Sequence, residues 1–142
     1  MKYIEEKGNL FEVSNEYKLV HCISSDFALG KGIAKQFVEK YDVKNKLLKT
    51  YKRNNWGGKG YCLQTDNVYN LVTKKFYFNK PTLNTLKDSL LDLKNNLLKE
   101  NITKIAMPQI GCGLDNLEWN MVRVLINQLF TDTDIEIKVC IL

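Results

Sequence analysis

Two loops of the sequence combine glycines with polar or acidic residues in a pattern suited to binding an anion. The first, SSDFALGKGIA at residues 24–34, places Gly30 and Gly32 at the start of an amphipathic segment. The second, MPQIGCGLD at residues 107–115, has glycines on both sides of a cysteine and ends at Asp115. Glycine lets a backbone approach a ligand closely, and a helix N-terminus presents unpaired N–H groups. Both loops could therefore hold phosphate.

Neither loop is specific by itself. The first lacks the third glycine of a dinucleotide fingerprint and the spacing of a Walker loop, so it could be only a tight strand-to-helix turn. Asp115 could serve as a general acid or base, or it could simply cap the following helix. Cys112 has no partner base, because the single histidine, His21, lies in an apolar segment typical of a buried strand. A Cys–His nucleophile pair is therefore disfavoured.

A third candidate for chemistry is Lys74, in the segment VTKKFYFNKP, where a strand is expected to pass into a loop. Lysines at strand ends are usually solvated, so the local pattern alone does not mark Lys74 as functional. A desolvated lysine can, however, act as a nucleophile toward a carbonyl or the C1 carbon of a sugar.

Hydrophobic periodicity predicts strands alternating with helices. The clearest helix has leucines spaced alternately by three and four residues, with Thr82 as its N-cap, and two strands near Asp66 form a possible hairpin. Such an order predicts an α/β sandwich with an at least partly parallel sheet, in which ligands bind beyond the carboxyl ends of the strands. Strands are expected at residues 19–24, 61–65, 67–74, 104–110 and 135–142, and helices at residues 32–41, 43–53, 80–100 and 116–130.

Composition narrows the class of protein. A chain of 142 residues without repeats or linkers predicts one domain, 1–142. No apolar run approaches the length of a membrane helix and no leader pattern opens the chain, so we expect a cytoplasmic protein that does not contact a membrane. The four cysteines lie far apart, which predicts buried, reduced thiols and neither a disulfide nor a metal site. The net charge of +5 suits a polyanionic partner, although the lysines are scattered.

Taken in order along the chain, the motifs KGNLF, HCISSD, GKGIA, LVTKK, NKPT, MPQIGCGLD, LEW and DIEIKVCIL resemble the macrodomain family. The resemblance is greatest to its branch of terminal ADP-ribose protein glycohydrolases, relatives of the antitoxin macrodomains that reverse ADP-ribosylation of DNA. It covers nearly the whole chain, and the ordered set is far more specific than any one motif. The resemblance implies a three-layer α/β/α macrodomain with a mixed central sheet that holds ADP-ribose in a cleft.

The resemblance also implies roles for individual residues. Lys74 matches the nucleophile that attacks C1 of the distal ribose, and Asp115 matches its acid/base partner. Leu10 and Leu142 match positions beside the adenosine, and Ser24 matches a polar contact in the cleft. The two loops would bind the diphosphate mainly through backbone atoms. The loop positions that match are Gly30, Lys31, Gly32, Ile33, Ala34, Gln109, Ile110, Gly111, Cys112, Gly113 and Leu114.

One position departs from the family pattern. Macrodomains usually carry an aspartate that accepts a hydrogen bond from the adenine amino group, and this sequence has Asn9 there. An amide oxygen can still accept, but its lack of charge predicts a weaker contact.

The implied activity is removal of ADP-ribose from acidic protein side chains or from nucleic-acid bases, through a covalent lysyl intermediate and without a cofactor or metal. The expected partners are ADP-ribose and ADP-ribosylated protein or nucleic acid, with possible DNA contact, and the protein is expected to be a monomer. The alternative is a reader module that binds ADP-ribose without catalysis. A reader needs only the two loops, so the presence of both Lys74 and Asp115 favours the enzyme.

Overall fold

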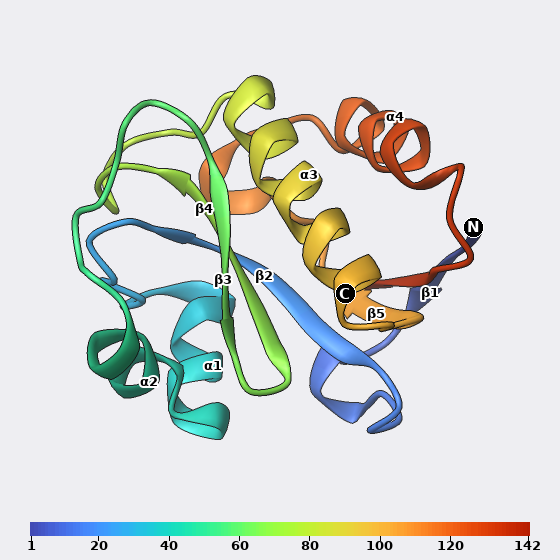
Figure 1. The fold of residues 1–142 in the computed structure, drawn as a ribbon, viewed down its shortest axis with the longest axis horizontal. Helices are drawn as coiled ribbons and strands as arrows, with labels where there is room; N and C mark the ends of the chain where they lie inside the picture. Colours follow the sequence, from blue (N-terminus) through green and yellow to red (C-terminus); the bar gives the residue numbers. More distant parts are fainter.

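A six-stranded mixed sheet runs through the middle of the molecule, with helices on both of its faces (Figure 1). The structure, a computed structural model, describes residues 1–142. The strand order across the sheet is β1-β6-β5-β2-β4-β3. The strands are β1 (Lys2–Lys7), β2 (Lys18–Ser24), β3 (Tyr61–Thr65), β4 (Val68–Lys74), β5 (Lys104–Met107) and β6 (Glu136–Ile141). The helices are α1 (Gly32–Tyr41), α2 (Val43–Thr50), α3 (Leu83–Lys99) and α4 (Trp119–Phe130), with 3₁₀ turns η1 (Leu10–Glu12) and η2 (Gly113–Asp115).

Four of the five strand pairings are parallel, and only β3 runs antiparallel to its neighbour β4. The β3–β4 connection is a tight turn in which Asp66 takes a left-handed conformation with φ of 54°. This confirms the expected hairpin. The parallel strands place their carboxyl ends at one edge of the sheet, which is where ligands collect in such folds.

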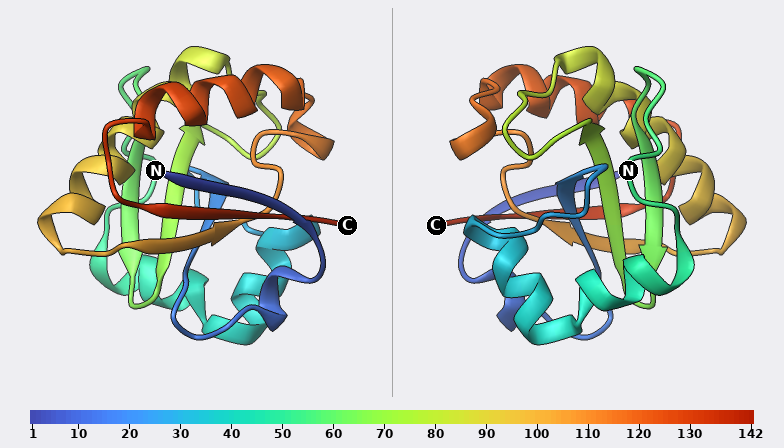
Figure 2. Two further views of the ribbon diagram at one scale, coloured as in Figure 1. Left: turned by 90° about the vertical axis from the view of Figure 1, so that its right-hand side faces the viewer. Right: turned by 90° about the vertical axis from the view of Figure 1, so that its left-hand side faces the viewer.

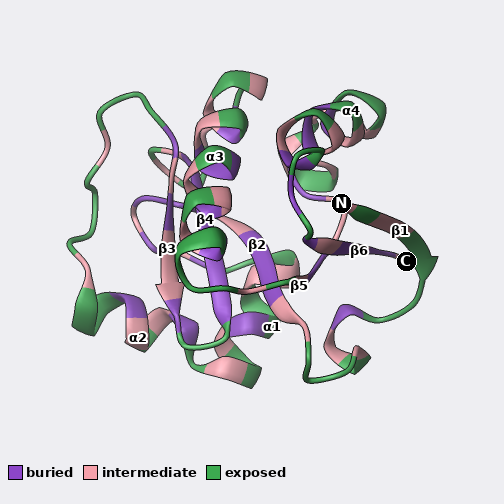
Figure 3. Cartoon of the chain, turned by 45° about the vertical axis from the view of Figure 1, so that its right-hand side comes forward, coloured by how far each residue is buried: buried purple, intermediate pink, exposed green.

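The helices form two outer layers, as expected for an α/β/α sandwich. Helices α3 and α4 cover one face of the sheet, and α1 and α2 cover the other (Figure 2). Burial follows this layering: the central strands and the sheet-facing side of α3 are buried, whereas β1 at the edge is largely exposed (Figure 3). None of the helices has the length and apolar character needed to cross a membrane.

Helix α3 forms as its sequence predicts. Its N-cap is Thr82, whose hydroxyl accepts from the N–H of Thr85, while the Thr85 hydroxyl accepts from the N–H of Thr82. This reciprocal capping box satisfies donors that the first helical turn leaves unpaired. The periodic leucines of α3 face the sheet and pack in the larger of the two hydrophobic clusters of the protein. The fully buried leucines are Leu86, Leu90, Leu93 and Leu97.

Several details of the fold differ from the sequence-based expectation: β5 ends at Met107 rather than at residue 110, and α3 begins at Leu83 rather than at residue 80. Strand β1 was not expected, because only Tyr3 and Ile4 of its six residues are even half-buried and no alternation marks it. Its pairing with β6 is what makes it a strand. Helix α2 is separated from α1 by Asp42 in a left-handed conformation and ends at Thr50, before the expected residue 53. Helix α4 begins at Trp119 rather than at residue 116.

Candidate active site

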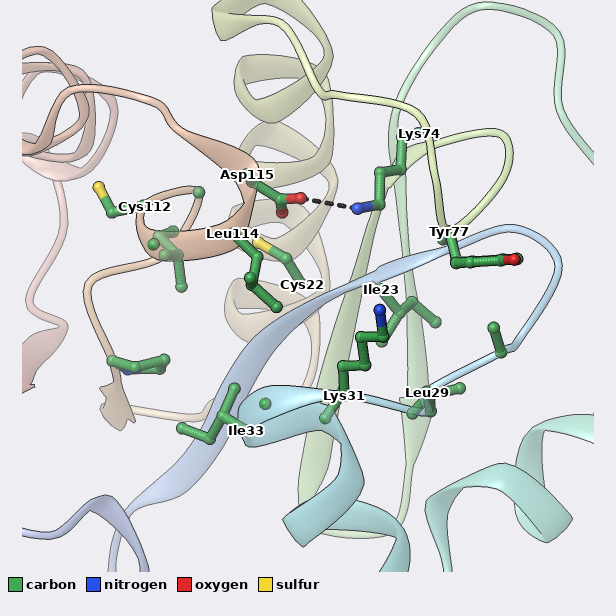
Figure 4. Close-up of a pocket in the computed structure, with 18 of the residues that line it drawn as sticks. Cys22, Ile23, Leu29, Lys31, Ile33, Lys74, Tyr77, Cys112, Leu114 and Asp115 are labelled. Atoms are coloured by element: carbon green, nitrogen blue, oxygen red, sulfur yellow. Dashed lines mark hydrogen bonds and ion pairs between the residues drawn. The ribbon is translucent and has the colours of Figure 1, made fainter.

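The cavity at the carboxyl ends of the parallel strands has a volume of about 830 Å³ (Figure 4). The residues that line it include Ser24 at the end of β2, Lys74 at the end of β4, and Leu142 just after β6. The two glycine-containing loops supply much of the rest of the wall. This volume is within the range of clefts that enclose a small ligand.

Lys74 and Asp115 point toward one another inside this cavity (Figure 4). The Nζ atom of Lys74 lies 2.6 Å from Oδ1 of Asp115, although the two residues are 41 positions apart in the chain. Their side chains are only 14% and 16% exposed. A charge-assisted contact in such a sheltered place is screened much less than a surface ion pair. The geometry therefore joins an amine and a carboxylate at hydrogen-bond distance, which allows a proton to pass between them.

A strand irregularity places Lys74 in position. Ile23 of β2 is paired with Val72 of β4, yet the next residue, Ser24, is paired with Lys74 rather than with Thr73. The extra residue in β4 breaks the alternation of side chains just before the lysine. Such irregularities re-aim side chains and are common next to active sites. A regular strand would have placed Lys74 on the same face as Val72.

Ser25 holds the backbone of the lysine segment. Its N–H donates to the carbonyl of Lys74 at 2.9 Å, and its hydroxyl donates to the carbonyl of Lys75 at 2.6 Å. Ser25 is fully buried, so these bonds are shielded from water. The end of β4 is thus tied to the loop after β2.

The loop between β2 and α1 leads into an uncapped helix. No side chain accepts a hydrogen bond from the first N–H groups of α1, which follow Lys31 and Gly32. Gly32 has a φ of +60°, a conformation that other residues adopt only with strain. Phe27 and Leu29, both buried, also have positive φ values, so burial holds this loop in a conformation that is otherwise rare. The free N–H groups and the partial positive charge of the helix end suit an anion.

Asp26 connects the same loop to the segment that follows Lys74. Its carboxylate accepts from the Ser24 hydroxyl at 2.5 Å and from the Ala28 N–H at 3.2 Å. It also accepts from the N–H of Tyr77 at 3.0 Å. One carboxylate thus fixes the spacing between the first glycine loop and the lysine segment.

The second glycine loop turns sharply at Gly111. Its φ is +74°, and a Cβ atom there would lie 2.8 Å from Cδ1 of Leu117. Asp115 ends the short turn η2, whereas the N-cap of α4 is Glu118. The interpretation of Asp115 as a helix cap is therefore wrong. Lys80, from the segment before α3, donates to the carbonyl of Leu114 and so ties this loop to the lysine side of the cavity.

The cysteines and the histidine do not form a nucleophilic pair. Cys22 and Cys112 line the cavity, but burial, followed by the nearby carboxylate of Asp115, raises the pKa of both thiols. They stay protonated at neutral pH, and a protonated thiol is a poor nucleophile. His21 is fully buried outside the cavity lining, with its ring stacked on Phe37 at 3.9 Å and its Nε2 atom 2.5 Å from Oδ1 of Asn70. It is a core histidine, as the sequence indicated.

Most of the candidate residues lie around the one cavity. Asn9 and Leu10 do not line it. Asn9 instead accepts from the N–H of Phe11 at 2.9 Å and caps η1, and Leu10 is buried in the cluster beneath α1 and α2. The candidates that do line the cavity are Ser24, Gly30, Lys31, Gly32, Ile33, Ala34, Lys74, Gln109, Ile110, Gly111, Cys112, Gly113, Leu114, Asp115 and Leu142.

Several lining residues were not among the sequence-based candidates, and three of them, Tyr77, Phe78 and Lys80, come from the segment that follows Lys74. The signal was present in the run FYF directly after the lysine pair of LVTKK. Three consecutive aromatics in a loop are unusual because no regular core face explains them. No group of three His, Cys, Asp or Glu side chains converges anywhere in the chain to hold a metal.

Comparison with known proteins agrees with this geometry. No family model matches the chain. The curated protein ADP-ribose glycohydrolase OARD1 is 42% identical in Bos taurus and 41% identical in Homo sapiens, in each case over 94% of this chain and 87% of the relative. Among solved structures, the macrodomain of Mycobacterium tuberculosis DarG superposes with a TM-score of 0.84 at 26% identity, covering 97% of this chain and 96% of that one.

The fold and the cavity at its strand ends define a macrodomain. The chain belongs to the macrodomain family, in the branch of the ADP-ribose glycohydrolases. Both the α/β class and the family that the ordered motifs resembled are thereby confirmed.

Proposed function

We propose that this protein is a hydrolase that releases ADP-ribose from a macromolecule through a covalent adduct on Lys74. The observation that carries the proposal is the 2.6 Å contact between Lys74 Nζ and Asp115 Oδ1 inside the cavity. The relatives that share 41–42% identity are named ADP-ribose glycohydrolases, which supports the reaction class. The acceptor is an acidic side chain of a protein or a base of a nucleic acid.

The ADP-ribose has a natural orientation in this cavity. The diphosphate lies against the N–H groups at the start of α1 and against the loop around Gly111, where glycine geometry exposes the backbone. The distal ribose then lies near Lys74, with its C1 carbon toward the amine. Leu142 lines the same cavity just after β6, which is separated from β4 by β5 and β2, and the adenosine would be held there.

The reaction proceeds in two balanced steps. In the first, the lone pair of Lys74 Nζ forms a bond to C1 of the ribose as the bond from C1 to the acceptor breaks. Asp115 takes the proton that the amine loses and passes it to the acceptor, which leaves with the electrons of the broken bond. In the second, water attacks C1 as the bond from C1 to Nζ breaks, and Asp115 takes a proton from the water and gives it to the amine. The net change is hydrolysis, and both side chains are restored.

The second candidate is a reader that binds ADP-ribose and does no chemistry. The pairing of an amine with a carboxylate at 2.6 Å favours the enzyme, because backbone donors alone are enough to bind a diphosphate. The decisive experiment incubates the protein with an ADP-ribosylated glutamate peptide and an ADP-ribosylated DNA strand in parallel and measures free ADP-ribose. Release from either substrate supports the hydrolase. Tight ADP-ribose binding with no release from either would favour the reader.

The covalent step has a separate test. A lysine adduct that opens to an imine can be reduced by cyanoborohydride, so wild-type protein quenched during turnover should gain the mass of one ADP-ribosyl group plus two hydrogens. Lys94→Ala is the matched control, because Lys94 also pairs with an aspartate, Asp132, at 2.8 Å but does not line the cavity. That variant should still form the adduct, whereas Lys74→Ala should not. An adduct of equal yield in Lys74→Ala would rule out this lysine as the nucleophile.

A further inference from the structure

The segment that follows Lys74 presents two aromatic rings at the mouth of the cavity. Tyr77 is 59% exposed and Phe78 is 66% exposed, and they are the only aromatic residues among the exposed large apolar side chains. Both residues line the cavity, and Figure 4 shows Tyr77 on the same side of the cavity as Lys74. Exposed apolar groups that gather at the rim of a pocket mark a binding surface more often than scattered ones do.

The aromatic segment is held in place by its own hydrogen bonds. The N–H of Phe76 donates to Oδ1 of Asn79 at 2.9 Å, and the N–H of Asn79 donates to the carbonyl of Phe76 at 3.0 Å. The N–H of Tyr77 donates to the carboxylate of Asp26 at 3.0 Å. The exposure of the rings is therefore built into the fold, and a ligand would not have to order the segment first.

The rings of Phe76, Tyr77 and Phe78 also pack against one another. Phe76 and Phe78 are nearly parallel, with ring centroids 5.3 Å apart and an interplanar angle of 15°. Tyr77 meets Phe78 edge-on, with a centroid distance of 5.4 Å and an interplanar angle of 89°. This packing holds the exposed rings of Tyr77 and Phe78 in a fixed orientation beside the cavity.

The position of this aromatic cluster suits contact with the macromolecule that carries the ADP-ribose, rather than with the ADP-ribose itself. The bond that breaks must lie within reach of Lys74 Nζ, and the two glycine loops are on the cavity wall that would hold the diphosphate. Tyr77 follows Lys74 by three residues and lies at the cavity rim. A macromolecule joined to C1 would leave the cavity past this rim.

Positive charge surrounds the same rim. Lys31 and Lys80 line the cavity, and Lys75 lies beside it with its Nζ atom 5.1 Å from the centroid of the Phe76 ring. All three are exposed and none forms an ion pair, although Lys80 donates to the carbonyl of Leu114. The nearby carboxylates are already engaged, Asp26 by three donors and Asp115 by Lys74. The rim therefore combines cations that no carboxylate neutralises with flat apolar rings, which is the combination that binds unpaired nucleotides.

We propose that Tyr77 and Phe78 stack unpaired bases of a single-stranded nucleic acid that carries the ADP-ribose, while Lys31, Lys75 and Lys80 contact its phosphates. This inference rests on the proposed glycohydrolase function and names its substrate class. An acidic peptide would satisfy the lysines but would leave the two ring faces without flat partners. A duplex would satisfy the lysines as well, but its bases are already stacked on one another.

The first test measures binding alone. A labelled, unmodified single-stranded oligodeoxynucleotide should bind more tightly than its duplex and than a glutamate-rich peptide of equal charge, as measured by fluorescence anisotropy at one fixed salt concentration. Tyr77→Ser/Phe78→Ser should weaken strand binding by about tenfold or more, because each stacked base contributes strongly to affinity. Phe78→Trp should preserve it, since the larger ring still stacks. The same strand made as RNA shows whether unpaired DNA or RNA is preferred.

The control for lost apolar surface is Leu98→Ser, which removes an exposed apolar side chain from α3, away from the cavity. It should bind the strand as wild type does. Thermal unfolding of the double variant shows that it remains folded. Equal affinity for strand and duplex, or wild-type strand affinity in the double variant, would overturn the proposal.

The second test measures substrate choice. The ratio of kcat/KM for an ADP-ribosylated strand to that for an ADP-ribosylated glutamate peptide should fall about tenfold in Tyr77→Ser/Phe78→Ser. An equal loss on both substrates would contradict selection of the acceptor by this segment. If wild-type protein released ADP-ribose from neither substrate, the hydrolase proposal would fall. The anisotropy measurements would still decide whether the aromatic rim binds nucleic acid.

Discussion

Lys74 Nζ and Asp115 Oδ1 meet at 2.6 Å although they come from opposite sides of the cavity, one from the end of β4 and the other from the turn after β5. Neither residue is positioned by its own segment alone. The irregular pairing of β2 with β4 aims the lysine, and the tight turn at Gly111 carries the carboxylate toward it. The pair depends on both strands being in register in one sheet.

Removal of the amine should abolish turnover. Lys74→Ala is expected to reduce ADP-ribose release by at least about a thousandfold, because the covalent route disappears. The affinity for free ADP-ribose, measured by calorimetry, should change little since the diphosphate is held by backbone groups. The control variant Lys94→Ala, outside the cavity, should retain full activity. Full activity in Lys74→Ala would end the covalent-lysine mechanism.

Removal of the carboxylate should slow both steps that move a proton. Asp115→Asn keeps the shape of the side chain but cannot accept the proton of the amine, so single-turnover release should fall by roughly a hundredfold or more. Rapid-quench measurements with intact-protein mass spectrometry would follow adduct and product together. A wild-type rate in this variant would show that Asp115 has no part in proton transfer.

The conformation of Gly111 should be sensitive to a single methyl group. Gly111→Ala adds a Cβ that lies 2.8 Å from Leu117 and forces alanine into a φ of +74°. Strain of this kind costs roughly 1–3 kcal/mol, so denaturant unfolding should show a loss of that size, accompanied by weaker ADP-ribose binding. Gly57→Ala is the matched control because no atom lies within 4 Å of a Cβ there. Equal stability of the two variants would argue against the strained turn.

Protonation of His21 should weaken the fold in mild acid. Burial lowers the pKa of His21 to about 4, against about 6.5 in an unfolded chain. Between these values the unfolded chain binds more protons, so stability should fall as the pH decreases from about 6.5 to about 4, by about 3 kcal/mol in all. Urea denaturation across this range would measure it. His21→Gln should lose this part of the pH dependence, and an identical slope in the variant would exclude His21 as its source.

The departure from the family pattern at Asn9 has its own test. Asn9→Asp keeps an oxygen that can accept from the N–H of Phe11, so η1 should remain capped. If this position contacts adenine, the added charge should strengthen ADP-ribose binding by roughly fivefold in calorimetry. Unchanged affinity would mean that the position does not contact the nucleotide. That outcome would agree with its place outside the cavity lining.

The regular elements of the fold were predictable because their signals are local. The leucines of α3 and its capping residues lie within a few positions of one another, and the β3–β4 hairpin needs only a short turn at Asp66. Strand β1 was not predictable in this way. Its residues show no alternation, and only its partner β6, at the other end of the chain, makes it part of the sheet.

The sequence by itself determined the family, through an ordered set of motifs along nearly the whole chain, and with it the candidates Lys74 and Asp115. Only the tertiary structure decided that these two side chains meet, that Asp115 does not cap α4, and that Tyr77 and Phe78 share the rim of their cavity. The physical reason is that helix and hairpin signals act over a few residues. Side-chain aim depends on strand register and on close packing between segments that are distant in the chain.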